Sequence, residues 1–503
     1  MSKKLYYSTC AILTPNIGIT IDDILSSKKE QDDEIYWCYC HNALSACYGN
    51  LNGCPSICYF CHSMYKRYAK KYGKRVHMIP IDRKDFVHKT HSWQFNSIEQ
   101  IKSIVYRDVY IGYGILSLYL SYTRDLDIKD IDGFRNYFTP IVSEICDYVD
   151  YVYDLLDQIR PDEIISFNGR LFDNRLFYDI ATALGIKYTA LEVLFSNGMR
   201  GKPLKKIRFV GGLPHSIIIN TQKINDLWQY SPLSDDEKTE IASSFYHLRR
   251  EGEYDLETVY ISAQKQGALP EGFNPSNRNI AIFNSSEDEY SAVGGEWDDT
   301  IFKSQYEAID YILQHSLPDF HYYLRIHPHL KGVKYQAHME LYSLSKYPNL
   351  TIIPPESEVS TYDLMDACEK VVTFGSTMGV ESAYWGKPSV LLRRSMYENL
   401  DICYQASCRE DVMPLLEEKL NPKPRLGALK YAYYLLDREY GVENNIIDID
   451  IEEKTFMGRI FQFTPYFKIW GSQILYQIAY FYYCVLLPKV DNGVHVFPDR
   501  YTT

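Results

Sequence analysis

Short runs of apolar, β-branched residues recur along the second half of the sequence and alternate with segments of helical periodicity. The predicted strands are 279–283, 322–326, 350–353, 370–374 and 389–392, and the predicted helices are 303–314, 362–367 and 378–385. Near-continuous apolar runs are typical of parallel strands that are covered on both faces. The alternation therefore predicts a doubly wound parallel sheet with helices on both sides.

The same rhythm is present, more weakly, in the first half. Residues 164–167 and 186–191 are predicted strands with a helix from about 175 to 184 between them, and 34–38 and 76–80 are shorter strand candidates. A chain of 503 residues is too long for one ordinary core. The sequence thus predicts an α/β protein with two Rossmann-like, doubly wound lobes.

The predicted linker between the lobes is 264–278, which is rich in Gly, Pro and Asn and has no periodicity. It separates a first lobe, 1–263, from a second lobe, 279–423. The remainder, 424–503, is helical and aromatic, and we expect it to brace the first lobe. In such proteins, ligands bind at the carboxyl ends of the strands, so a cleft between the lobes is the expected site.

The charge balance argues against nucleic acid as a partner. The formal net charge is −12, from 65 acidic and 53 basic residues, whereas nucleic-acid-binding chains usually have a positive field. One local basic run occurs, and we interpret it as a solvated helix face. It consists of Lys66, Arg67, Lys70, Lys71, Lys74 and Arg75.

Two segments bear on localisation. Residues 1–9 lack the long apolar core and cleavage site of a signal peptide, which favours a cytoplasmic protein. Residues 469–488 contain no charge and are long enough to cross a bilayer, but Ser472, Gln473 and Gln477 interrupt them. We expect a helix packed on the protein that contacts the inner face of the plasma membrane, with a spanning helix as the alternative.

The most specific motif is Thr-Phe-Gly-Ser-Thr-Met-Gly-Val-Glu-Ser-Ala-Tyr-Trp-Gly-Lys-Pro at 373–388. A strand ends at Phe374, Gly375 permits a tight turn, and Ser376 and Thr377 lie where a helix begins. Backbone N–H groups and hydroxyls at such a start suit a phosphate or diphosphate. Glu381, one turn further on, could accept hydrogen bonds from ribose; a capped helix with Glu381 compensating its dipole is the alternative.

Two more polar loops follow strands of the same sheet. Arg325-Ile-His327-Pro328-His comes after 322–326, and Arg325 and His327 could meet a base or phosphate. Asn-Ser285-Ser286-Glu287-Asp288-Glu-Tyr comes after 279–283, where hydroxyls could bind phosphate or sugar and a carboxylate could act as a base. A serine-capped helix start is the alternative for the second loop.

The order of these three motifs resembles that of bacterial capsule and O-antigen biosynthesis proteins with a GT-B fold, a family that includes Kdo transferases using a cytidine nucleotide. The resemblance covers 279–392 well and extends weakly to 168–170, Arg175, Glu192 and 112–114. It implies that His327, Pro328, Ser376 and Thr377 hold a donor nucleotide. It also implies a glycosyltransferase that moves a sugar from a UDP- or CMP-linked donor to a surface polysaccharide or a lipid-linked glycan precursor.

GT-B enzymes need no catalytic metal, because basic side chains and a helix N-terminus take the charge of the leaving group. The candidate general bases are Asp288 and Glu287 of the second lobe and Asp173 and Glu192 of the first. The acceptor-side candidates are Asn168 and Arg170, in an Asn-Gly-Arg turn at a strand end. For that turn, ordinary turn chemistry and a surface ion pair are the alternative interpretation.

Seven of the twelve cysteines precede residue 62, in a Cys-rich segment at 38–62 and at Cys10. Cys47, Cys54, Cys58 and Cys61 could share one structural zinc, although their spacing matches no standard finger. Buried free thiols are the alternative.

Three other functions remain open from the sequence alone. A nucleotide-sugar epimerase of similar build would turn over its substrate without an acceptor. A non-catalytic scaffold of the polysaccharide assembly machinery would retain a nucleotide site without turnover. A zinc-dependent interaction module would require bound zinc.

Overall fold

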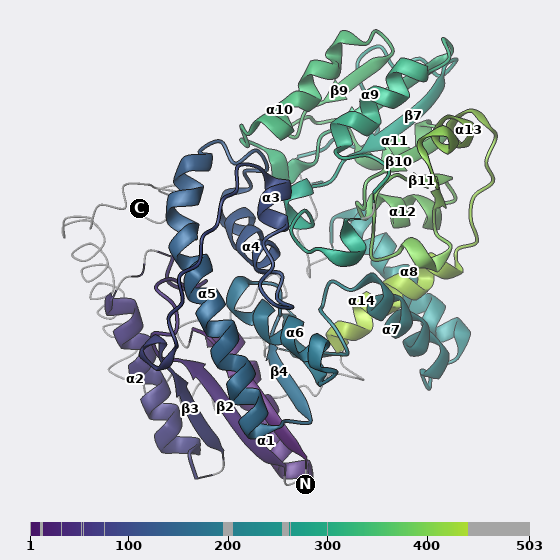
Figure 1. The fold of residues 1–503 in the computed structure, drawn as a ribbon. Helices are drawn as coiled ribbons and strands as arrows, with labels where there is room; N and C mark the ends of the chain where they lie inside the picture. The colour runs from purple at the N-terminus through teal and green to yellow at the C-terminus, as the bar shows by residue number, and fades with distance from the viewer. Residues whose placement is uncertain are drawn as a thin grey trace, which may run out of the picture. The chain divides into compact units, whose positions relative to one another are not determined.

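The computed structural model describes residues 2–440 except 11–13, 32, 52, 54, 75, 195–204, 254–260, 262 and 299. The chain forms two compact units (Figure 1). Among the described residues, the first unit extends to Pro214 and the second begins at His215. Each unit has its own sheet, with helices on both faces.

The sheet of the first unit has the strand order β3-β2-β1-β4-β5-β6. Its strands are β1 (Lys3–Ser8), β2 (Glu34–Cys40), β3 (His77–Ile81), β4 (Glu163–Phe167), β5 (Lys187–Leu194) and β6 (Lys205–Val210). Neighbouring strands are parallel except β6, which runs antiparallel to β5. The helices are α1 (Thr14–Gln31), α2 (Pro55–Tyr72), α3 (Ile98–Lys102), α4 (Ile111–Thr123), α5 (Ile131–Ile159) and α6 (Phe172–Leu184).

The alternation of side chains along β1 explains how this sheet is covered on both faces. Tyr6 and Trp37 point to the face that α1 and α2 cover, where they join one buried cluster. Tyr7 points to the other face and stacks on Phe177 of α6, with 4.0 Å between the ring centroids. Tyr148 of α5 meets Tyr7 edge-on at 6.4 Å.

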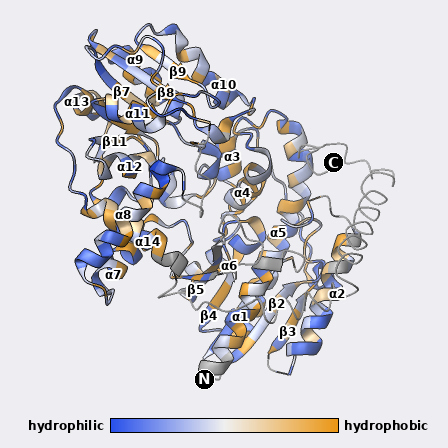
Figure 2. Ribbon diagram, turned by 180° about the vertical axis from the view of Figure 1, so that it is seen from behind, coloured by the Kyte–Doolittle hydropathy of each residue, from blue (hydrophilic) through white to orange (hydrophobic). Residues whose placement is uncertain are grey.

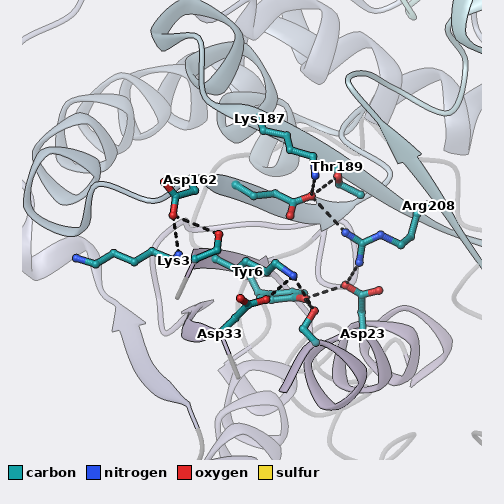
Figure 3. Close-up of polar contacts among 12 residues, drawn as sticks. Lys3, Tyr6, Asp23, Asp33, Asp162, Lys187, Thr189 and Arg208 are labelled. Atoms are coloured by element: carbon teal, nitrogen blue, oxygen red, sulfur yellow. Dashed lines mark hydrogen bonds and ion pairs between the residues drawn. The ribbon is translucent and has the colours of Figure 1, made fainter. Parts of the chain in front are cut away.

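A buried charge network joins α1 to β4 and β6 (Figure 3). Asp23 of α1 lies 2.7 Å from the Lys206 ammonium. It also lies 2.5 Å from the Arg208 guanidinium and accepts a 2.8 Å hydrogen bond from Tyr6. Arg208 also reaches Glu163 at 3.2 Å. Burial alone would raise the pKa of Asp23, but the two cations lower it below its usual value. The network therefore fixes the antiparallel edge strand onto α1.

The second unit repeats the topology, with the strand order β12-β11-β10-β7-β8-β9. Its strands are β7 (Arg278–Phe283), β8 (Phe320–Arg325), β9 (Leu350–Ile353), β10 (Lys370–Thr373), β11 (Ser389–Leu391) and β12 (Tyr404–Gln405), and all neighbours are parallel. In each unit the order is third, second, first, fourth, fifth and sixth, which is the Rossmann order. Two Rossmann-like, doubly wound units are the fold class that the sequence predicts.

Helices cover the second sheet in a similar way. Its helices are α7 (Ile217–Tyr230), α8 (Asp235–Glu251), α9 (Gln305–His315), α10 (Gln336–Ser343), α11 (Thr361–Ala367), α12 (Met378–Tyr384), α13 (Val412–Glu417) and α14 (Leu426–Tyr440). Residues of α9, α10 and α13 pack on one face, and residues of α11 on the other. Residues of α7, α8 and α14 form a further layer against α12, in which Tyr246 stacks on Tyr384 at 3.9 Å.

The compact units divide the chain at a different place from the predicted linker at 264–278. Helices α7 and α8 belong to the second unit, because α7 begins on a loop of the second sheet. Glu296 of that loop accepts a 3.1 Å hydrogen bond from Ser216, and the Trp297 indole donates to the His215 carbonyl at 2.8 Å. Amphipathic helices outside a sheet join whichever core they pack on, and a composition break does not reveal this.

The predicted tail at 424–503 lies only partly within the described residues. Its first helix, α14, packs on α7 and α8, which lie within the predicted first lobe at 1–263 but belong to the second compact unit. The uncharged segment at 469–488 lies outside the described residues. Within the part of the chain that the structure describes, no helix is both long enough and apolar enough to cross a bilayer.

Candidate functional site

Four polar loops meet at the carboxyl edge of the second sheet, following β7, β8, β10 and β11. The chain order reverses between β7 and β10, the position at which doubly wound sheets bind ligands. We call this set of loops, together with the last residue of β8, the second-unit edge: 284–289, 325–328, 374–377 and 392–395. It brings together the three motifs singled out in the sequence and adds a fourth.

Two side chains fix these loops to one another. Ser285 donates a 2.9 Å hydrogen bond to the Phe374 carbonyl, which joins the loops after β7 and β10. The buried Asn284 side chain accepts a 2.7 Å hydrogen bond from the His327 N–H, which joins the loops after β7 and β8. His327 is half-buried, and Pro328 begins a short 3-10 helix, Pro328–Leu330.

The turn after β10 requires glycine. Gly375 has φ +95°, and a Cβ there would lie 3.0 Å from the Arg394 carbonyl oxygen. The next carbonyl, at Ser376, accepts a 2.6 Å hydrogen bond from the buried Tyr397 hydroxyl, and the Ser376 hydroxyl accepts a 3.3 Å bond from the Met378 N–H. The strand-to-helix turn predicted from the sequence is thus held tightly against the loop after β11.

Glu381 lies inside the protein rather than on the ligand side of that turn. It is 1% exposed, and its Oε1 accepts a 3.1 Å hydrogen bond from the Arg249 guanidinium of α8. Its Oε2 accepts from the Tyr362 hydroxyl of α11. Arg249 also donates to the Thr377 hydroxyl at 3.2 Å. This placement differs from the expected ribose contact, because both carboxylate oxygens already bind residues of neighbouring helices.

The two predicted bases of the second unit have partners of their own. Glu287 forms an ion pair with Arg393 and accepts a 3.1 Å hydrogen bond from the Gln305 N–H. Asp288 accepts a 2.6 Å bond from the Ser286 hydroxyl. Arg393 was missed by the sequence reasoning, although a Leu-Arg-Arg run directly after a predicted strand is the signal that could have identified it.

Arg325 is the most unusual residue of the second-unit edge. Its side chain is 3% exposed at the end of β8, on the same face as Tyr323. Nη2 donates to the Ser357 carbonyl at 3.2 Å, whereas Nε and Nη1 have no hydrogen-bond partner among the described residues. Burial lowers the pKa of Arg325 to about 10, partly offset by Glu356. A buried guanidinium in this state suits a ligand that supplies an anion.

The carboxyl edge of the first sheet contains a second polar arrangement. Asn168, directly after β4, has φ +56° and donates a 2.6 Å hydrogen bond to the half-buried Glu192 of β5. Its side-chain oxygen accepts from the Arg170 N–H at 3.1 Å, and the Arg170 guanidinium reaches Ser121 at 3.2 Å. Gly169 follows with φ +75°, and a Cβ there would lie 2.5 Å from the Tyr188 hydroxyl.

Asp173, the other candidate base of the first unit, is 1% exposed. Its carboxyl accepts a hydrogen bond from the Thr9 hydroxyl at the end of β1. Burial raises the pKa of Asp173, and the Thr9 hydrogen bond only partly opposes that shift. Asp173 is therefore closed off from solvent, whereas Glu192 is not.

The structure gathers a different set of thiols from the one predicted to bind zinc. Cys10 is hydrogen-bonded with Cys47 and Cys61, which together with burial raises the pKa of its thiol. Cys58 instead accepts a 3.3 Å hydrogen bond from the Asn50 amide, and Cys54 lies outside the described residues. Within the described ranges, no group of three or more His, Cys, Asp or Glu residues is arranged to hold a metal. A zinc that includes Cys54 stays a prediction, which metal analysis of the purified protein can test.

No protein-family model matches the sequence, and no curated protein does either. Among solved structures, the chain is similar to two of Thermosulfurimonas dismutans KpsC. The structure titled beta Kdo 2,4 transferase has 18% identity over 54% of this chain and 79% of that chain, with a TM-score of 0.36. The one titled beta Kdo 2,7 transferase has 15% identity over 56% and 80%, with a TM-score of 0.34.

The chain is also similar to the UDP-GlcNAc 2-epimerase from Neisseria meningitidis bound to UDP-GlcNAc. That match has 11% identity over 87% of this chain and 99% of that chain, with a TM-score of 0.27. At these identities and TM-scores no activity can be assigned by similarity, so the functional proposal depends on the residues described above.

Proposed function

We propose that this protein is a glycosyltransferase that binds a nucleotide-sugar donor at the second-unit edge. The sugar would pass to a surface polysaccharide, of capsule or O-antigen type, or to its lipid-linked precursor. The observation that supports donor binding is the buried guanidinium of Arg325, whose Nε and Nη1 donate no hydrogen bond to any described residue. The acceptor class follows from the sequence resemblance at 279–392.

A phosphate group is the ligand that best suits Arg325. Guanidinium and phosphate form strong, charge-assisted hydrogen bonds, so the oxygens of a bound phosphate would supply the acceptor that Nε or Nη1 lacks. Arg393 is another cation of the edge, and Glu287 holds it in place. When the bond from the anomeric carbon to the phosphate oxygen breaks, these cations would stabilise the charge on the departing nucleotide. We therefore expect transfer without a catalytic metal.

The acceptor hydroxyl must lose its proton as its oxygen bonds to the anomeric carbon, and we assign that proton to Glu192. Glu287 is already paired with Arg393, Asp288 accepts a hydrogen bond from Ser286, and Asp173 is closed off from solvent. Glu192 is half-buried at the carboxyl edge of its sheet, and its carboxylate is oriented by Asn168 at 2.6 Å. Asn168 would be a positioning residue, and its left-handed backbone is the kind of local strain that functional sites retain.

The test of donor binding is a thermal-shift screen of the purified protein against UDP, CMP, GDP and dTDP. A nucleotide that binds only the folded state stabilises it by about 2.7 kcal/mol at a hundredfold excess over Kd. One nucleotide should raise the melting temperature of wild type and fail to raise that of Arg325→Met. Arg278→Met is the matched control, since Arg278 pairs with Glu369 at the opposite end of the same sheet.

Turnover separates the remaining functions. A glycosyltransferase releases nucleotide in proportion to added acceptor, whereas an epimerase converts the nucleotide sugar without any acceptor. If a nucleotide binds but the nucleotide sugar is not turned over with or without acceptor, the non-catalytic scaffold is the remaining function. If no nucleotide shifts the melting temperature at millimolar concentration, the donor-site proposal is wrong.

A further inference from the structure

Helix α2 (Pro55–Tyr72) has two faces of opposite character. Its inner face packs on the first sheet, where Tyr65 and Tyr68 are buried against Trp37, with ring centroids 6.2 Å and 5.8 Å away. This contact holds the helix firmly at the edge of the first unit formed by β2 and β3. The outer face therefore has a fixed orientation relative to that sheet.

The outer face is strongly basic. Its cations are all exposed, and they lie in the last turns of α2 and just beyond it: Lys66, Arg67, Lys70, Lys71 and Lys74. At 100° per residue these positions span an arc of about 140°, opposite the buried tyrosines. The helix contains no acidic residue, and its C-terminal half is coloured as hydrophilic in Figure 2. The solvated helix face expected from the sequence is thus present.

One aromatic residue shares this face. Tyr59 is 71% exposed, and the helical repeat places it between Lys66 and Lys70 around the axis. Tyrosine has an apolar ring and a polar hydroxyl, a combination that is favoured at the boundary between water and lipid. Exposed cations together with an exposed aromatic form an amphipathic contact surface. We call Tyr59 and the five cations the α2 basic face.

We propose that the α2 basic face docks on an anionic lipid surface. Opposite charge favours this partner, because each lysine or arginine near an anionic membrane strengthens binding about fivefold. Tyr59 would insert at the headgroup level, a contribution that duplex nucleic acid would not use. The formal net charge of −12 for the whole chain also disfavours nucleic acid, since the rest of the surface repels a long polyanion. This inference is independent of sugar transfer and goes beyond it.

The experiment is co-sedimentation of the full-length protein with vesicles. Vesicles of phosphatidylcholine alone are compared with vesicles that contain one third phosphatidylglycerol, at low and at high salt. Wild type should sediment with the anionic vesicles only, and high salt should release it, because the Debye length falls from about 10 Å at 0.1 M to about 3 Å at 1 M.

The variant Lys66→Gln/Arg67→Gln/Lys70→Gln should weaken the vesicle partition coefficient about a hundredfold, from three losses of about fivefold each. Its matched control is Lys265→Gln/Lys303→Gln/Lys419→Gln, which removes the same charge from exposed sites of the second unit. The control should bind as wild type does. The separate variant Tyr59→Ser should also weaken binding to the anionic vesicles, but without altering the salt dependence of that binding.

Three results would overturn the proposal. One is that wild type does not bind the anionic vesicles. Another is that the two triple variants lose binding equally, which would indicate a general charge effect. The third is that the α2 variant binds vesicles as wild type does while losing binding to duplex DNA, which would identify a nucleic-acid surface. The melting temperature of each variant, measured without lipid, shows whether it is folded.

Discussion

The Asn168 side-chain amide donates a 2.6 Å hydrogen bond to the Glu192 carboxylate, joining the loop after β4 to strand β5. Asn168 can do so because its backbone is left-handed, at φ +56°, a conformation that asparagine tolerates better than most residues. Both ends of the amide are engaged, since its oxygen accepts from the Arg170 N–H. Glu192 is thus held in one orientation at the carboxyl edge of the first sheet.

Glu192→Gln should lower kcat about 10²- to 10⁴-fold, the usual contribution of a general base, with little change in donor affinity. Asn168→Gly keeps the left-handed backbone accessible but removes the amide, so it should lower kcat less and leave the melting temperature close to wild type. Steady-state kinetics of both variants check this. If Glu192→Gln retains wild-type kcat, Glu192 is not the base.

Arg325→Met should separate folding from binding. Methionine fills a similar volume without the buried charge, so the ligand-free protein should gain stability on the order of 1 kcal/mol. Nucleotide affinity should fall about 10- to 100-fold, because hydrogen bonds to a charged group are worth about 1.5–3 kcal/mol. Chemical denaturation and nucleotide titration measure the two effects. A variant that is destabilised yet binds normally would make Arg325 a structural residue.

Glu381 and Arg249 should behave as one unit. Glu381→Met leaves the guanidinium of Arg249, 10% exposed, without its carboxylate and should cost about 3–5 kcal/mol of unfolding free energy. The double variant Arg249→Met/Glu381→Met should recover most of that loss. A double-mutant cycle by denaturant unfolding tests the coupling. Additive losses would show that the two side chains act independently.

Asp173 should make stability pH-dependent. Burial raises its pKa in the folded state, so the folded state binds more protons than the unfolded state above the unfolded pKa of about 3.9. The contribution of Asp173 to stability therefore falls as pH rises from about 4 through the folded pKa. Asp173→Asn removes this dependence and should have a larger free energy of unfolding than wild type at neutral pH. Denaturation curves from about pH 4 to pH 7 measure the difference in unfolding free energy between the variant and wild type. A difference that stays constant with pH would show that Asp173 does not titrate in this range.

The second sheet is predictable from its sequence almost strand by strand. The predicted 350–353 is β9, and 279–283 differs from β7 only in its first residue. Apolar runs bounded by Gly, Pro and Asn are local signals, so they can be recognised without knowledge of the fold. In the first half, β1 and β6 were missed, because β1 has two lysines at its start and β6 is a basic edge strand.

By itself, the sequence determined that three polar loops follow neighbouring strands, and thus that they meet at one edge. Only the tertiary structure decided which charges in and behind those loops are paired. Glu381 and Arg249 are 132 residues apart, and Glu287 and Arg393 are 106 apart. Such pairs form where helices and loops from distant segments pack together, and the local hydrophobic periodicity of the sequence does not predict that packing. The same packing left Nε and Nη1 of the buried Arg325 without a hydrogen-bond partner among the described residues, so burial, rather than its place in the motif, distinguishes it as the residue that suits an anion.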